Sequence, residues 1–155
     1  MKVQSSFNTV NSFRLIVTTL GNVTLAYRIE TVYKVVKRSQ IPDSNLEHTG
    51  IIHINGEAAV IVDLHRTLFN AYTPSEQGYF VVVKSRVGEL IAVPVETSPN
   101  LMDVSREHVR VLPSSYRQAN RLTMASHVAV VPYEKETLTI FIIDENSLLP
   151  SVFNT

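Results

Sequence analysis

The chain has 155 residues, 45% of them hydrophobic and 18% charged, and its 14 acidic residues equal its 14 lysines and arginines. This composition fits one domain with a sizeable core and carries too little charge for a disordered chain. A net charge of zero argues against a partner held mainly by charge, such as bulk nucleic acid. The absence of cysteine excludes disulfides, cysteine–zinc sites and thiol catalysis, and is typical of a reducing compartment.

No stretch is long and apolar enough to span a membrane, and we therefore expect no direct membrane insertion. The opening residues MKVQSSFNTVNS are polar and lack the apolar segment of a secretory signal. We predict that residues 1–12 form a flexible N-terminal arm and that the protein is cytoplasmic.

The first part of the chain predicts a hairpin followed by a third strand. Apolar residues alternate over 15–20 and 23–29, on either side of a turn at Gly21-Asn22. Residues 30–37 fit a strand or one helical turn, and their three β-branched valines favour the strand. Residues 41–49 are rich in turn formers and predict a loop.

The stretch GIIHINGEAAVIVDLHRTLF at 50–69 predicts a second hairpin. Asn55-Gly56 lies between two alternating apolar runs, and both residues tolerate the positive φ of a type I′ turn. Asp63 follows the second run, where its carboxylate can accept hydrogen bonds from the first N–H groups of a short helix starting at Leu64.

A polar linker at 70–78 opens the second part. Residues 79–95 predict a hairpin that turns at 87–89, and Pro94 places its strand at an edge or a bulge because proline has no N–H. Ser98-Pro99 suits the start of a helix.

Two further elements close the chain. Residues 113–123 are polar and suit a loop or a short helix, and residues 127–144 predict a hairpin that turns at 134–137. Asp144 ends this hairpin and can cap a second helical turn.

The two parts repeat one another. The segment VIVDLHRTLF at 60–69 parallels IFIIDENSLL at 140–149, and each part runs hairpin, irregular stretch, hairpin, capped turn. About five strands per part leave open edges unless each sheet closes. We therefore predict an all-β fold of two five-stranded β-barrel subdomains that share a core and carry short helices. The domain covers 13–149, with subdomain 1 at about 13–70 and subdomain 2 at about 78–149.

Catalytic motifs are missing. None of the five histidines has the spacing of a metal site, and no nucleophile elbow or glycine-rich phosphate loop occurs. Asp63 and His65 could form a hydrolase-like pair, but Asp63 has a capping role and its counterpart Asp144 has no following histidine. We expect a binding protein rather than an enzyme, without a cofactor or metal.

A mild basic cluster offers an alternative function. Its members are Arg106, Arg110, Arg117 and Arg121, joined by His108. Only one aromatic residue, Tyr116, is interleaved, which favours a solvated face over a nucleic-acid surface. A small β-barrel that binds nucleic acid through the four arginines remains the alternative, and the main prediction has no nucleic-acid partner.

Three stretches resemble the CheW-like domains of chemotaxis adaptors. The block at 50–69 resembles the family signature, in which apolar residues and Asn-Leu-Arg-Gly precede an apolar strand, Asp-Leu and a short helix. FRLIVTTLGNVTLAYRIETVYKVV resembles the family's first hairpin, and LTIFIIDENSLL resembles its closing strand and helix. The chain departs from the signature where Asn55 replaces the arginine, His53 the asparagine and Val60 a proline.

The resemblance implies two five-stranded barrels around a common core and a non-enzymatic signal-transduction adaptor. Such adaptors couple the cytoplasmic tips of methyl-accepting chemoreceptors, in membrane receptor arrays, to the regulatory domain of a CheA-type histidine kinase. The pathway is chemotaxis or a related response such as pilus motility or phototaxis. The resemblance implies Val32 and Lys34 in the strand after the first hairpin, and Asn55 and Gly56 at the turn, as partner-interface residues.

Overall fold

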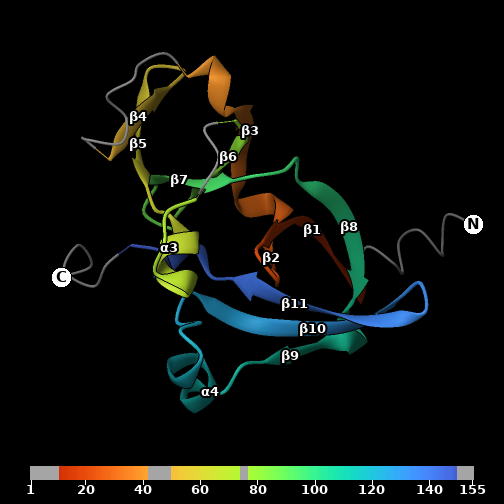
Figure 1. Cartoon of the computed structure of the whole chain (residues 1–155). Helices are drawn as coiled ribbons and strands as arrows, with labels where there is room; N and C mark the ends of the chain where they lie inside the picture. Colours follow the sequence, from red (N-terminus) through yellow and green to blue (C-terminus); the bar gives the residue numbers. More distant parts are fainter. Residues whose placement is uncertain (1–10, 42–49, 74–76, 150–155) are drawn as a thin grey trace, which may run out of the picture.

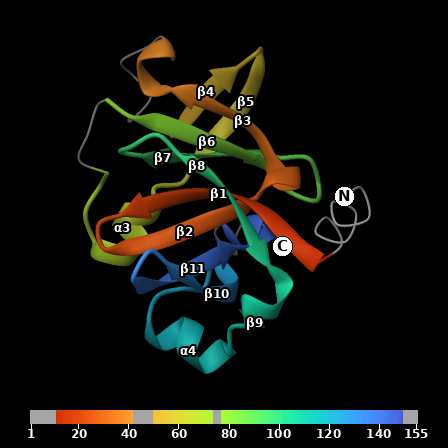
Figure 2. The ribbon, with the colours of Figure 1, turned by 90° about the vertical axis from the view of Figure 1, so that its right-hand side faces the viewer.

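The computed structural model describes residues 11–41, 50–73 and 77–149. These residues form two curled β-sheets with short helices at their ends. The sheets lie one above the other in Figure 1, and Figure 2 shows the same molecule turned by 90°. The predicted mainly β fold is confirmed. The predicted N-terminal arm and the loop at 41–49 lie almost entirely outside the described residues.

The six-stranded sheet contains the first and last hairpins. In spatial order its strands are β8 (Asn100–Ser105), β1 (Ser12–Leu20), β2 (Val23–Arg28), β11 (Glu136–Ile143), β10 (Ala125–Tyr133) and β9 (Val109–Val111). Gly21-Asn22 forms the predicted turn between β1 and β2, because Leu20 pairs with Val23. The sixth strand, β9, was not expected: three residues after a 3-10 turn pair with β10 and extend the sheet.

The five-stranded sheet contains the two middle hairpins. In spatial order its strands are β3 (Val32–Lys37), β6 (Tyr79–Lys84), β7 (Leu90–Val95), β5 (Glu57–Ile61) and β4 (Ile51–Ile54). The valine-rich segment after the first hairpin is therefore a strand, as its β-branched residues predicted.

Each sheet contains one hairpin from the other half of the chain. The order β8-β1-β2-β11-β10 in one sheet corresponds position by position to β3-β6-β7-β5-β4 in the other. Each order includes one parallel pair at the matching place, β2 with β11 and β7 with β5. This correspondence supports the duplication inferred from the sequence, and both halves contribute strands to both sheets.

The helices are short and lie where the strands end. They are α3 (Leu64–Phe69), α4 (Ser114–Ala119) and the 3-10 turns η1 (Ile29–Thr31), η2 (Arg38–Gln40), η3 (Arg106–His108) and η4 (Glu145–Ser147). Asp63 accepts hydrogen bonds from the backbone N–H groups of His65 (3.0 Å) and Arg66 (3.3 Å), and so caps α3 as predicted. Asp144 likewise accepts from the N–H of Asn146 at 3.0 Å.

Two predictions about local structure were wrong. Pro94 lies in β7, an interior strand, and pairs with Phe80 without a bulge. Proline is tolerated because β7 pairs with β5 only over 90–92, so the position of Pro94 has a neighbouring strand on one side alone. Ser98-Pro99 starts no helix: β8 begins at Asn100 and pairs with β1, because Met102 and Val104 pack against the interior of the six-stranded sheet.

Buried side chains form three clusters. One fills the space between the sheets and draws on β1, β2, β6, β7 and α3, with Leu20, Leu25, Tyr27, Leu64, Val81, Val83 and Ile91 among its members. The others lie inside the two curls, Leu15, Val17, Val104 and Ile140 in the six-stranded sheet and Ile52, Phe80, Val82 and Leu90 in the five-stranded one. Fully burying one such side chain contributes about 1.5–3 kcal/mol, so the sheets are held together by a shared apolar layer.

Candidate partner-docking surface

The four predicted interface residues lie on two elements of the five-stranded sheet. Val32 and Lys34 belong to β3, an edge strand, and Asn55 and Gly56 join β4 to β5. Val32 is half-buried and packs against the core between the sheets, whereas Lys34 is exposed. A β-bulge lies between them, because Val32 pairs with Val83 whereas Lys34 pairs with Val82.

The Asn55-Gly56 turn has the conformation that the sequence predicted. The φ angles are 53° at Asn55 and 83° at Gly56, both positive as a type I′ turn requires. Ile54 pairs with Glu57, so the turn contains only these two residues. Both are exposed, and no heavy atom lies within 4 Å of the place where a Cβ on Gly56 would stand. The turn is thus open to a partner.

A side-chain hydrogen bond brings the two elements together. The Tyr33 hydroxyl donates to Glu57 Oε2 at 2.8 Å, although β3 and β5 are separated by two strands in the sheet. This contact requires the sheet to curl. Lys84 adds its ammonium 5.9 Å from the centre of the Tyr33 ring. Because Tyr33 adjoins Val32 and Glu57 follows Gly56, the predicted interface residues lie at one end of the curled sheet.

We define the docking end as Val32, Tyr33, Lys34, Asn55, Gly56, Glu57 and Lys84. Lys84 lies over the Tyr33 ring, Glu57 accepts from its hydroxyl, and the neighbouring Lys34 is exposed, so the docking end offers aromatic area together with charges of both signs. Tyr33, Glu57 and Lys84 were missed by the sequence analysis, because the bulge in β3 and the curl that joins β3 to β5 leave no periodic signal. Of these three, only Tyr33 gave a hint, as an aromatic residue in a valine-rich strand.

Asp63 and His65 do not form a catalytic pair. Asp63 caps α3 and also accepts hydrogen bonds from the backbone N–H and the hydroxyl of Thr73 at 2.9 and 2.8 Å. The His65 Nδ1 lies 2.6 Å from the carbonyl oxygen of Ala71, and the ring packs against Phe69 with 4.9 Å between centroids. Both side chains therefore hold the end of α3 in place.

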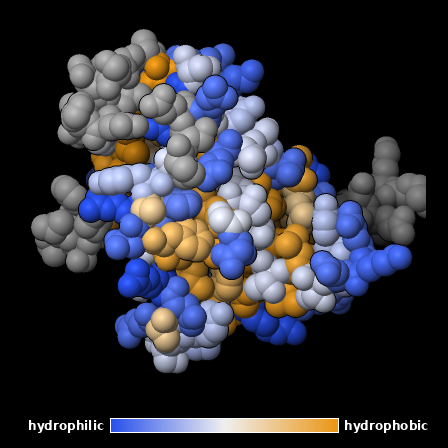
Figure 3. All heavy atoms as spheres, in the orientation of Figure 1, coloured by the Kyte–Doolittle hydropathy of each residue, from blue (hydrophilic) through white to orange (hydrophobic). Residues whose placement is uncertain are grey.

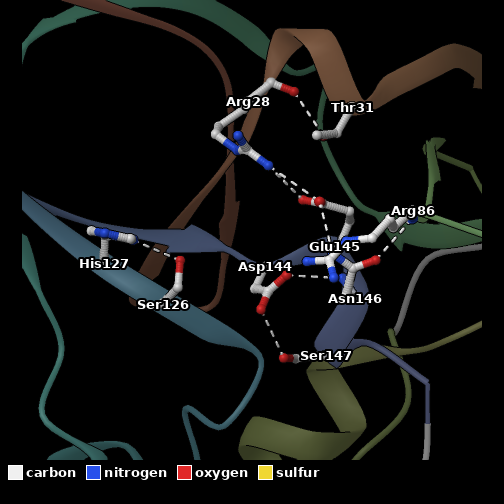
Figure 4. Close-up of polar contacts among 9 residues, drawn as sticks. All are labelled: Arg28, Thr31, Arg86, Ser126, His127, Asp144, Glu145, Asn146 and Ser147. Carbon is white, nitrogen blue, oxygen red and sulfur yellow. Dashed lines mark hydrogen bonds and ion pairs between the residues drawn. The ribbon is translucent and has the colours of Figure 1, made fainter. Parts of the chain in front are cut away.

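The remaining titratable groups of residues 11–41, 50–73 and 77–149 also lack a catalytic arrangement. In the part of the chain that the structure describes, no three His, Asp or Glu side chains are grouped as a metal would need. Ser126 Oγ lies 2.7 Å from His127 Nδ1. In Figure 4 the nearby Asp144 carboxylate turns away from this pair toward Ser147, whose hydroxyl donates to it at 3.1 Å. Among the described residues, no carboxylate thus completes a triad with this serine and histidine.

Three of the four arginines of the basic cluster make local structural contacts. The Arg110 Nη1 donates to the carbonyls of Glu107 and Val109, and the Arg117 Nη2 donates to the carbonyl of Thr123. The Arg106 guanidinium stacks on the Phe13 ring at 4.8 Å. These contacts occupy three of the four cations and disfavour a nucleic-acid surface built from them.

A polar network ties the end of the six-stranded sheet to the five-stranded one (Figure 4). Arg28 at the end of β2 donates through Nη2 to both Glu145 oxygens, at 3.1 and 3.2 Å. Asn146 donates to Glu145 at 3.2 Å and accepts from the backbone N–H of Arg86, in the β6–β7 turn, at 2.8 Å. Glu145 is buried, and η4 thereby fixes the two sheets to each other.

Two shallow pockets lie beside the helical turns. One, of about 190 Å³, is lined by Ser85, Arg86, Val87, Glu89, Glu145, Asn146 and Leu149. The other, of about 250 Å³, is lined by Val23, Leu68, Phe69, Tyr116, Asn120, Leu122 and Phe141. Figure 3 shows hydrophobic atoms gathered around the second, over α3 and β11. Neither pocket contains the convergent catalytic groups that an enzyme site would need.

An open turn and an exposed sheet edge on a mainly β molecule are typical of the class of protein-docking domains. A family model described as "CheW-like domain" matches residues 14–152. The chain therefore belongs to the CheW-like domain family. This family consists of non-enzymatic scaffold proteins, and the chain is a chemotaxis scaffold adaptor.

A solved structure supports the fold. The chain is similar to the scaffolding protein TtCheW from Thermoanaerobacter tengcongensis, with a TM-score of 0.68 and 18% sequence identity, covering 88% of this chain and 86% of that one. The comparison with curated proteins gave no match. Within the described ranges, no helix has the length and apolar character needed to cross a membrane.

Proposed function

We propose that this protein couples methyl-accepting chemoreceptors to a CheA-type histidine kinase. The family match over residues 14–152 carries this proposal, because it extends over both sheets. The adaptor works in the cytoplasm, is recruited to membrane receptor arrays, and serves chemotaxis or a related response of the pilus or phototaxis type. It binds the regulatory domain of the kinase and the cytoplasmic tip of the receptor.

The docking end is the proposed kinase contact. Its β3 edge and its open Asn55-Gly56 turn expose backbone groups and side chains together, which suits docking against another sheet. Asn55 stands where the family signature has an arginine, so this contact relies less on a cation at the turn. Lys34 and Lys84 supply positive charge beside it instead.

Calorimetric titration with the kinase regulatory domain, and separately with a receptor-tip fragment, tests the proposal. We expect Lys34→Glu to weaken kinase binding by about tenfold, or about 1.4 kcal/mol. Lys135→Glu is the matched control, since Lys135 lies in the β10–β11 turn, the counterpart of the β4–β5 turn in the other sheet. If both variants changed the affinity equally, the docking end would not be the kinase contact. If the parent protein bound no kinase regulatory domain at all, the coupling function would be refuted.

A further inference from the structure

Asn55 stands out chemically as well as structurally. It is the only one of the ten asparagines in the sequence that is followed by glycine. An asparagine side chain is labile when the backbone nitrogen of the next residue can reach its amide carbon, and a side chain on that next residue hinders the approach. Gly56 has none, and no heavy atom lies within 4 Å of where its Cβ would be.

The hairpin also leaves the attacking nitrogen unoccupied. In a two-residue turn the pairing hydrogen bonds are made by the flanking residues, here Ile54 and Glu57, and not by the turn residues. Across the described ranges, no hydrogen bond engages the Gly56 N–H or the Asn55 side chain. Both residues are exposed, so water has access to them.

We propose that Asn55 is a site of spontaneous deamidation in the folded protein. The Gly56 nitrogen loses its proton and bonds to the Asn55 amide carbon, while the bond from that carbon to Nδ2 breaks and ammonia leaves with the proton. Water then opens the cyclic imide at either carbonyl. One opening gives aspartate at position 55 and the other gives isoaspartate, in which the main chain continues through the former side chain.

The two products affect the docking end differently. Aspartate suits a type I′ turn as well as asparagine does, so the hairpin is kept and one negative charge is added beside Glu57. Isoaspartate lengthens the main chain by one carbon, which is incompatible with the two-residue connection between Ile54 and Glu57. Either product changes the formal net charge from +0 to −1.

Peptide mapping of the folded protein, aged in mildly alkaline buffer, tests this inference. Cleavage after glutamate releases residues 48–57, in which Asn55 is the only asparagine. We expect its conversion to acid to proceed an order of magnitude faster than that of Asn22, an exposed asparagine that lies in another two-residue turn and is followed by valine. The variant Asn55→Gln should lose the conversion.

Equal rates at Asn55 and Asn22 would overturn the proposal, and so would conversion of Asn55 that occurs only when the protein is held in urea. The aspartate and isoaspartate products are separated by chromatography of the same peptide, and an isoaspartate methyltransferase labels only the second. The measurement needs no partner protein, so its outcome is independent of the adaptor function proposed above.

Discussion

The Tyr33 hydroxyl donates a hydrogen bond to the Glu57 carboxylate at 2.8 Å, and so joins an edge strand of the five-stranded sheet to the hairpin near its opposite edge. Both residues are exposed, and water competes for each of them. Such a bond contributes little to global stability. Its structural effect is to hold β3 at a fixed distance from the Asn55-Gly56 turn.

Removing this bond should therefore affect docking more than folding. We expect Tyr33→Phe to lower the unfolding free energy by less than about 0.5 kcal/mol. Affinity for the kinase regulatory domain should fall about fivefold, or about 1 kcal/mol, because a partner that covers the docking end excludes the water that competes for this bond and so strengthens it. Chemical denaturation and calorimetry measure the two quantities. Tyr72→Phe, which removes an exposed hydroxyl beside α3, is the control, and an equal affinity loss there would contradict the role given to Tyr33.

Two glycines with positive φ should respond differently to alanine. Gly56 and Gly78 have φ angles of 83° and 143°, so a side chain strains the backbone at both. A Cβ on Gly56 meets nothing within 4 Å, whereas one on Gly78 would collide with the carbonyl oxygen of Val95. We expect Gly56→Ala to lower the free energy of unfolding by about 1 kcal/mol. Gly78→Ala should lower it by about 3 kcal/mol or more, because the backbone must move. Urea denaturation of both variants checks the order, and equal costs would show that strain alone decides.

The sequence predicted local elements better than their partners. The predicted turn at Asn55-Gly56 and the predicted helix cap at Asp63 were correct, because a few adjacent residues decide a type I′ turn or a helix cap. The duplication was also visible, whereas the exchange of hairpins between the sheets was not, since alternation shows that a strand has two faces but not which strand lies beside it. Pro94 was misplaced for the same reason: its tolerance depends on where β5 ends.

The candidate site was predicted in part. The family resemblance supplied Val32, Lys34, Asn55 and Gly56 as interface candidates, which stay a prediction. The Tyr33–Glu57 hydrogen bond could not be predicted, because it depends on a bulge and on the curl of a five-stranded sheet.

The Arg28–Glu145 ion pair should prove important for the way the sheets are held together. Glu145 is buried, so Arg28→Ala leaves its carboxylate without the guanidinium. Removing one partner of a buried ion pair lowers the free energy of unfolding by about 3–5 kcal/mol. The Arg28 side chain, however, is 39% exposed. We therefore expect about 1–2 kcal/mol after allowing for solvent screening.

Glu145→Gln is the comparison for this pair, because it keeps the shape and the contact with Asn146 while removing the charge. It should cost less than Arg28→Ala, and the double variant should cost less than the sum of the two, which a double-mutant cycle in urea measures. Strict additivity would mean that the two side chains stabilise the protein independently.

The buried phenol of Tyr27 should make the protein sensitive to alkali. Neither this hydroxyl nor that of the nearby Thr18 makes a hydrogen bond of acceptable geometry among the described residues. Burial raises the pKa of the phenol well above its ordinary value, against a smaller opposing effect of the Thr18 hydroxyl. The folded state thus favours the protonated form. Stability from this group is complete below the unfolded pKa of about 10 and is lost as the pH rises above that value.

Tyr27→Phe should remove this pH dependence and keep the ring that packs between the sheets. Because it also removes an unpaired buried hydroxyl, whose burial costs about 1–3 kcal/mol, the variant should be at least as stable as the parent at neutral pH and clearly more stable in alkali. Urea denaturation at neutral and alkaline pH measures both effects. A loss of stability at neutral pH would show that the Tyr27 hydroxyl has a favourable partner, such as a buried water shared with Thr18.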